Sequence, residues 1–163
     1  MNLRGSRMSS PREVLVDSTF LLPTLGIKVS QVSESDLKEM AKLRSKAKLF
    51  CIYQSLVEVM GKVGREWAVA PEENVLETVE GGLRSLLESG VYTWICPSTK
   101  ALMDAAKMRA RGHKDMIDNV LYSTATDLGM LLLSIDMELV KFLDENHYST
   151  ERIVNIKKLH SLM

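Results

Sequence analysis

Four acidic residues stand beside apolar segments at positions where their side chains could do chemistry together. Asp17 and Asp136 follow short apolar runs, while Glu58 and Asp118 lie in segments with a helical pattern. If folding brings them into one cleft, each pair of like charges repels by about 4 kcal/mol at an effective dielectric of roughly 20. Such a cluster persists when some carboxyls are protonated or when a cation neutralises them. Carboxylate oxygens with no His or Cys close by in the chain favour Mg²⁺ or Mn²⁺ over zinc.

Each acid taken alone also has a structural explanation. Asp17 could cap a turn, Asp118 could lie in the exposed first turn of a helix, and Asp136 could be a helix N-cap. For a single acid this structural role is the more common one. Glu58 differs because it lies within an apolar helical set from Leu56 to Val63, and such conflicts with simple patterning tend to mark function.

The stretch from 118 to 136 is expected to position two of the acids. It begins as an amphipathic helix at Asp118, stops at Gly129, and passes through the apolar run Met130–Leu133 to Asp136. A helix, a glycine stop and a strand let this connection fold back on itself. Both carboxylates could then face the crevice at the carboxyl ends of the strands, where open α/β sheets bind ligands.

Short apolar strands alternating with helical segments predict one α/β domain. The expected strands cover residues 13–16, 49–53, 91–96 and 130–133, with a weak edge strand at 152–156. This order favours a mainly parallel central sheet flanked by helices on both faces. We expect a disordered lead-in over 1–12, the domain over 13–156 and a frayed C-terminus over 157–163.

The composition restricts the class of protein further. A chain of 163 residues suits one domain, and 21 basic against 21 acidic residues argue against a general nucleic-acid-binding surface. No apolar run reaches the ~18 residues of a membrane span, and no secretory signal is present, so a cytoplasmic protein without membrane contact is expected. Cys51 and Cys96 lie in apolar runs and are expected to be buried, inert thiols.

Three segments of the chain resemble the PIN-domain ribonucleases, the family of the VapC toxins. They are VLVDSTFLLP around Asp17, SLVEVMGK around Glu58, and DNVLYSTATDLGMLLLSID from Asp118 to Asp136. In the third segment the family pattern begins with an Asp, followed by a small residue seven positions on and a Gly eleven positions on. An apolar strand comes next, and then a Thr or Ser two residues before a second Asp. The chain fills these places with Asp118, Ala125, Gly129, Ser134 and Asp136. The resemblance covers roughly residues 13–145.

The resemblance implies a single PIN-like domain that acts as a metal-dependent endoribonuclease and hydrolyses RNA phosphodiester bonds. Asp17, Asp118 and Asp136 would hold Mg²⁺ or Mn²⁺, directly or through its waters. Glu58 would bind a second metal or orient the attacking water. The chain would be a toxin of a toxin–antitoxin pair, as many members are.

Supporting residues are expected around these acids. The resemblance implies that Ser18 and Ser134, the latter in place of the usual Thr, donate hydrogen bonds that orient the carboxylates. Next to Asp118 the chain carries a basic cluster whose members could contact RNA phosphates. Ordinary solvated helix positions explain this cluster about equally well. The cluster consists of Arg109, Arg111, His113 and Lys114.

Partners and rival functions are also implied. Toxins of this family commonly form homodimers and dock an antitoxin helix in an apolar groove, for which residues 37–43 or 75–87 would serve. A catalytically inactive PIN-fold module that binds RNA or acts as a scaffold is the main alternative, and a plain protein-interaction domain is another. A haloacid-dehalogenase-like phosphotransfer domain is disfavoured because Thr19 stands where that family places its second Asp.

Overall fold

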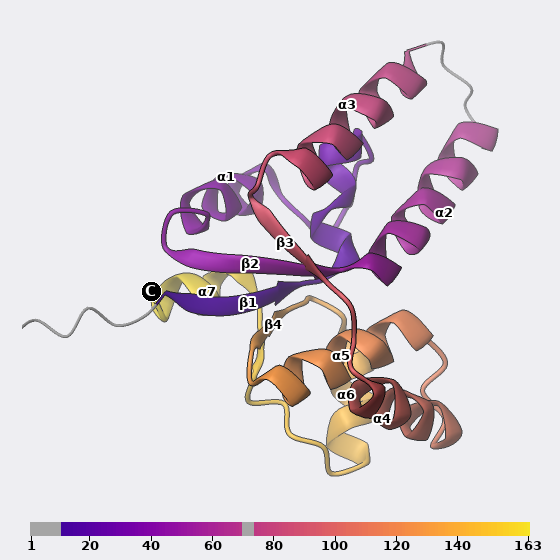
Figure 1. Cartoon of the computed structure of the whole chain (residues 1–163), viewed down its shortest axis with the longest axis vertical. Helices are drawn as coiled ribbons and strands as arrows, with labels where there is room; N and C mark the ends of the chain where they lie inside the picture. Colours follow the sequence, from indigo (N-terminus) through magenta and orange to yellow (C-terminus); the bar gives the residue numbers. More distant parts are fainter. Residues whose placement is uncertain (1–10, 70–73) are drawn as a thin grey trace, which may run out of the picture.

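The computed structural model describes residues 11–69 and 74–163. Their strands form one sheet in the order β3-β2-β1-β4-β5, and all neighbouring strands run parallel (Figure 1). This confirms the predicted α/β class. The strands are β1 (Arg12–Val16), β2 (Ala47–Ile52), β3 (Tyr92–Ile95), β4 (Leu131–Leu133) and β5 (Ile153–Val154).

The strand order places a reversal next to β1. From β1 the chain builds outward to β2 and β3, and then returns to place β4 on the other side of β1. Val16 pairs with Leu133, and the backbone N–H of Asp17 donates to the Leu133 oxygen at 3.1 Å. The residues that follow β1 and β4 are therefore neighbours. Open α/β sheets bind ligands at such a switch point, outside the carboxyl ends of the strands.

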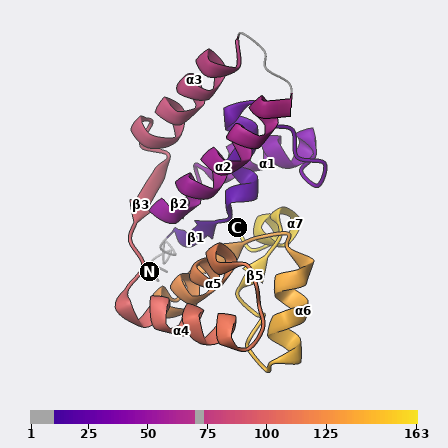
Figure 2. The same cartoon turned by 90° about the vertical axis from the view of Figure 1, so that its right-hand side faces the viewer.

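Helices cover both faces of the sheet (Figures 1 and 2). Alternation along β1 explains this, because Val14 and Val16 belong to one apolar core while Leu15 belongs to the other. The first core packs under α1 (Glu34–Leu43), α2 (Tyr53–Val69), α3 (Val75–Glu88) and α7 (Ile156–Ser161). The second packs under α4 (Thr99–Ala110), α5 (Met116–Leu128) and α6 (Met137–Glu145).

Two short 3₁₀ helices connect β1 to the first helical layer. They are η1 (Ser18–Phe20) and η2 (Leu22–Leu25). Helix α3 packs so closely on η2 that a Cβ atom added to Gly82 would collide with the backbone oxygen of Thr24. A glycine pair within a helical pattern is expected to weaken or bend a helix, but α3 continues through Gly81 and Gly82, and the second of them permits this close packing.

The chain ends differ from the prediction. Residues 157–163 were expected to fray, but most of them belong to α7, and Leu159 is fully buried. Asn155 caps this helix by accepting from the backbone N–H of Lys158 at 2.8 Å. At the other end, β1 begins at Arg12, one residue inside the expected lead-in, while residues 1–10 lie outside the described part of the chain.

Several smaller predictions also need correction. Tyr53 begins α2 instead of ending β2, and the weak edge strand is shorter than expected. Pro71, at which the sequence pattern also predicts a helix start, lies outside the described residues. Cys51 is buried, as expected, but Cys96 is exposed because β3 ends at Ile95. None of the described helices is long and apolar enough to cross a membrane.

Candidate active site

Asp17 lies at the switch point, where β1 ends, and it is 4% exposed. Its Oδ2 accepts from the hydroxyl of Ser134 at 2.7 Å, and its Oδ1 accepts from the Ser18 hydroxyl at 3.3 Å and from the backbone N–H of Thr19 at 3.1 Å. Burial raises the pKa of Asp17, and the Glu58 charge raises it further, while the three hydrogen bonds lower it. Asp17 is thus a buried carboxyl held in one orientation.

The turn after β4 links Asp17 to Asp136. Ser134 donates to Asp17 and accepts from the backbone N–H of Asp136 at 3.2 Å. Asp136 in turn caps α6, because its Oδ1 accepts from the first backbone N–H groups of that helix at 2.7 and 3.0 Å. The structural explanation considered for Asp136 is therefore correct, and it leaves Oδ2 without a partner among these capping bonds.

Asp118 comes to the same place from the first turn of α5. Its pKa is raised to about 9, mainly by burial and also by the negative charges of Asp17, Asp115 and Asp136 and by the interaction of its carboxyl with that of Asp136. Three of the four predicted acids are thus electrostatically coupled. Asp115 is the N-cap of α5.

Glu58 lies on α2 and faces the same region less directly. One of its carboxylate oxygens forms an ion pair with Lys62 at 2.6 Å, one turn along the helix. The other oxygen is buried and has no hydrogen-bond partner in the described structure. Its charge raises the pKa of Asp17. A buried carboxylate oxygen without a partner is costly, and it suits a site that a water or a cation completes.

The donor set suits a hard divalent cation, although it does not form a closed cage. Among residues 11–69 and 74–163, no group of three or more His, Cys, Asp or Glu side chains is arranged to hold a metal ion. Magnesium needs less than that, because it retains several waters and binds through one or two carboxylates together with substrate phosphates. The Asp118–Asp136 pair and the unpartnered Glu58 oxygen fit this mode of binding.

A cavity of about 450 Å³ opens beside this pair, and we call it the acidic cavity. Asp118 and Asp136 line it, whereas Asp17 and Glu58 do not. The cavity therefore gives access to two of the predicted acids, whereas Asp17 is buried. Its lining residues are Gly112, His113, Lys114, Asp115, Asp118, Asp136, Glu138 and Phe142.

The predicted RNA-binding residues divide into two kinds. Lys114 lines the acidic cavity. Arg109 instead donates to the backbone oxygen of Lys114 at 2.9 Å. Arg111 donates to the Tyr148 hydroxyl at 3.0 Å and lies over that ring at 5.3 Å. Lys114 is thus placed to meet a polyanion in the cavity, while the two arginines support the surrounding loop and its neighbours.

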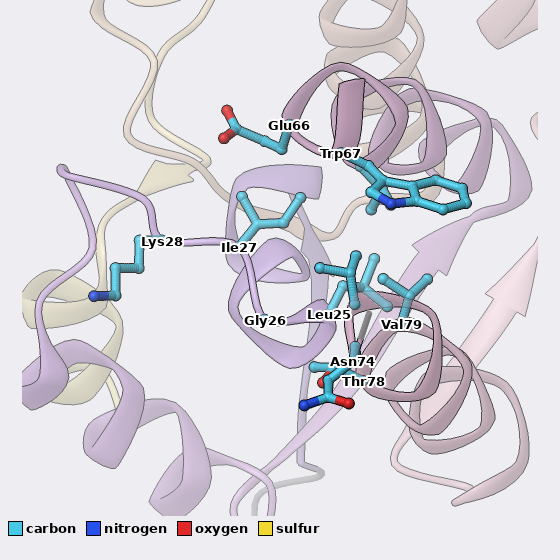
Figure 3. A pocket seen from close by; sticks show the side chains of 11 residues that line it. Leu25, Gly26, Ile27, Lys28, Glu66, Trp67, Asn74, Thr78 and Val79 are labelled. Carbon is cyan, nitrogen blue, oxygen red and sulfur yellow. The ribbon is translucent and has the colours of Figure 1, made fainter. Parts of the chain in front are cut away.

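A second cavity, of about 490 Å³, lies between η2, α2 and α3, and we call it the apolar cavity. Figure 3 shows the Trp67 ring facing Leu25 and Val79 across it. None of the four predicted acids lines this space. The lining residues are Leu25, Gly26, Ile27, Lys28, Val63, Glu66, Trp67, Asn74, Val75, Thr78 and Val79.

Solved structures share this architecture. The crystal structure of PAE2754 from Pyrobaculum aerophilum is 15% identical, with a TM-score of 0.64 over 93% of this chain and 96% of that one. The crystal structure of VapBC2 from Rickettsia felis, bound to a DNA fragment from their promoter, is 11% identical, with a TM-score of 0.58 over 80% of this chain and 92% of that one. No family model and no curated protein matches the sequence. The chain therefore has a PIN-domain, VapC-like fold.

Proposed function

We propose that this chain is a metal-dependent endoribonuclease that hydrolyses RNA phosphodiester bonds at the acidic cavity. The observation that carries the proposal is that Asp118 and Asp136 line one cavity, while Ser134 links the carboxylate of Asp17 to the backbone of Asp136. Such an accumulation of carboxyls is costly to fold and is typical of a site that a cation completes. The PIN-like fold is consistent with a nuclease.

Each acid has a role in this proposal. Asp118 and Asp136, which line the cavity, would hold Mg²⁺ or Mn²⁺, with Asp17 behind them holding it directly or through water. Glu58 would bind a second ion or orient the attacking water. When bound, such an ion offsets charge on the phosphoryl oxygens and lowers the pKa of a bound water.

The remaining residues position these acids and the substrate. Ser134 and Ser18 would maintain the orientation of Asp17, since both hydroxyls donate to it. Lys114 would contact a phosphate of the RNA from the cavity wall. Arg109 would act on RNA mainly by holding Lys114, and Arg111 would add positive charge nearby.

A cleavage assay on single-stranded RNA tests this function. The protein is expected to cleave with Mn²⁺ or Mg²⁺ and to stop when EDTA is added. Asp17→Asn and Asp118→Asn, which keep the shape of the side chain, are expected to lower the rate at least about 100-fold without unfolding. Asp104→Asn, which changes an exposed acid on α4, is the matched control. Equal cleavage by the site variants and the control would falsify the proposal.

The main alternative is a catalytically inactive PIN-fold module that binds RNA or acts as a scaffold. The same preparation distinguishes it, because such a module would retain RNA on a filter or gel without cleaving it. Retention that is unaffected by EDTA and by Asp118→Asn would favour this alternative. The Glu58–Lys62 ion pair is the feature most compatible with it, since it partly neutralises one acid of the site.

We also propose that the protein pairs with an antitoxin, whose helix would dock in the apolar cavity. Of the two predicted surfaces, that of α3 is favoured, because Val75 and Val79 line this cavity beside Trp67. Leu37 lies at a smaller cavity of about 200 Å³. Trp67→Glu is expected to abolish the complex while leaving the thermal melt unchanged, and an unaltered affinity would argue against this site. Homodimer formation and a cytoplasmic location remain predictions.

A further inference from the structure

A buried histidine on the acidic cavity has no role in the proposed reaction. His113 lies in the loop between α4 and α5, is 8% exposed, and lines the cavity. Its Nδ1 lies 2.7 Å from Oδ1 of Asn119, which is fully buried on α5. Its ring centroid lies 4.9 Å from that of Phe142. These contacts hold the imidazole ring in one orientation.

Asn119 determines which ring nitrogen carries the proton. Its Nδ2 donates to the backbone oxygen of His113 at 3.2 Å, and a backbone oxygen can only accept. The amide oxygen therefore faces Nδ1, and because that oxygen is also only an acceptor, Nδ1 must carry a hydrogen. In the uncharged imidazole, Nε2 is then left with a free lone pair.

Nε2 has no partner in the described part of the chain. Nδ1 makes the hydrogen bond of this ring, whereas Nε2 makes none and is not sealed from solvent. Because His113 is 8% exposed and lines the cavity, we take an Nε2 that is not sealed from solvent to be open to a ligand there.

We propose that Nε2 of His113 accepts a hydrogen bond from a ribose 2′-hydroxyl and thereby makes the acidic cavity select RNA over DNA. This inference rests on the proposed nuclease function. A phosphodiester offers only acceptors and cannot partner an unprotonated Nε2. The 2′-hydroxyl is a donor, and it is the group by which a protein distinguishes RNA from DNA. Lys114, on the same cavity wall, is left for the phosphate.

The carboxylates of the cavity are less suited to this task. Asp115 accepts from two backbone N–H groups at the start of α5, and Asp136 does the same at the start of α6. Asp118 is engaged with Asp136, and both would hold the ion in the proposed function. Glu138 is exposed and therefore solvated. His113 is the enclosed acceptor that no other interaction occupies.

The substitution His113→Asn tests Nε2 by itself. An asparagine amide can donate to Asn119 from the position of Nδ1, but it has no group in the position of Nε2. His113→Gln is the matched control, because its longer side chain can place an amide oxygen near that position. The measurement is kcat/KM with Mn²⁺ on a mixed-sequence single-stranded RNA and on the DNA of the same sequence, with thermal melts to compare folding.

His113→Asn is expected to reduce the preference for RNA over DNA about tenfold, which corresponds to one hydrogen bond to a substrate hydroxyl. His113→Gln is expected to retain more of the preference. A loss of that size on both substrates alike would mean that Nε2 acts on the phosphate backbone or on folding, and would overturn the assignment. An unchanged preference in His113→Asn would also overturn it.

The unaltered protein provides a test that does not depend on any variant folding. RNA carrying a single 2′-deoxy nucleotide at each position in turn is expected to be cut about tenfold more slowly when that nucleotide occupies the cavity. Equal cleavage of RNA and DNA by the unaltered protein would overturn the ribose assignment and leave the nuclease function standing. If no Mn²⁺-dependent cleavage occurs at all, the proposed function fails, and the ribose assignment fails with it.

Discussion

The two cavities of this molecule have similar volumes, about 450 and 490 Å³, but differently charged linings. The acidic cavity brings Asp118 and Asp136 together, whereas the apolar cavity combines apolar side chains such as Trp67 and Val79 with polar ones and with one charge of each sign. Volume therefore does not distinguish the proposed active site from the other cavity. Partly buried like charge does, because it lowers stability unless a ligand compensates for it.

The cavities also differ in what forms them. The acidic cavity lies where β1 and β4 deliver Asp17 and Asp136 to one end of the sheet, beside the first turn of α5. The apolar cavity lies within one helical layer, where α3 packs on η2 through Gly82. The carboxyl ends of paired strands position groups rigidly, which suits chemistry. An apolar space between helices suits a partner helix.

The sharpest contrast comes from changing one carboxyl to an amide in each cavity. Asp136→Asn is expected to lower Mn²⁺-dependent RNA cleavage at least about 100-fold, because it removes a proposed ion ligand. Glu66→Gln, at the apolar cavity, is expected to change the rate by less than about twofold, since it meets neither ion nor substrate. If Glu66→Gln lowered the initial rate more than Asp136→Asn does, the acidic cavity would not be the site of cleavage.

The apolar cavity depends on helix packing, so its most sensitive position is a glycine. Gly82→Ala is expected to lower the free energy of unfolding by about 2 kcal/mol, because the added methyl group meets the Thr24 backbone. Gly81→Ala meets nothing and is expected to raise it by up to about 1 kcal/mol through helix propensity. Urea denaturation measures both. A Gly82→Ala protein as stable as the parent would mean that η2 yields easily.

The carboxyl of Asp118 in the acidic cavity is expected to make the free energy of unfolding depend on pH. The folded-state pKa of Asp118, about 9, lies above the reference value of 3.8. The stabilisation from protonated Asp118 is therefore complete below about pH 4 and is lost as pH rises towards 9. Asp118→Asn abolishes this dependence, so in EDTA it is expected to be more stable than the parent near the upper end by at least about 1 kcal/mol.

Thermal melts across that pH range provide the measurement, and Asp127→Asn on the same helix is the control. Hydrogen bonds from Ser98 and Lys100 lower the pKa of Asp127, so its contribution has the opposite sign. It is present above the unfolded pKa and is lost as pH falls. A parallel pH profile for the parent and Asp118→Asn would show that Asp118 is not enclosed with other carboxyls.

The smallest expected effect concerns the cation of the acidic cavity. Lys114→Met is expected to raise KM for RNA a few-fold, at roughly 1 kcal/mol for one phosphate contact, and to leave kcat nearly unchanged. It is also expected to reduce the dependence of KM on salt. Lys141→Met, on the exposed side of α6, is the control. If KM depends on salt to the same degree in the parent and in Lys114→Met, Lys114 does not contact the substrate.

Much of the fold could be predicted from the sequence because the decisive signals are local. The run from Asp118 through Gly129 to Asp136 contains a helix, a glycine stop and a strand within a short stretch. Asp17 and Asp136 could be predicted for the same reason, because each follows a short apolar run in the sequence. Boundaries were less predictable, as at Tyr53, where an aromatic residue at the end of an apolar run begins a helix.

The site contains features that no local pattern reveals. The ion pair of Glu58 with Lys62 joins residues four positions apart on a helix, and this spacing could have been used to predict it from the sequence. The bond between His113 and Asn119 could not, because histidine and asparagine have no preferred spacing in a loop followed by a helix. The C-terminal helix was missed because it is short and the Asn155 cap that begins it is a weak signal.

The order of strands and helices, and the acids that follow them, could be predicted from the sequence because hydrophobic periodicity and glycine stops act between near neighbours. The burial of Asp17, and the cavity that Asp118 and Asp136 share with His113, arise only in the folded chain. Those relations depend on β4 pairing with β1 across more than a hundred residues of chain. Distant pairing sets which charges share a low-dielectric space, and that sharing raises the pKa values of Asp17 and Asp118.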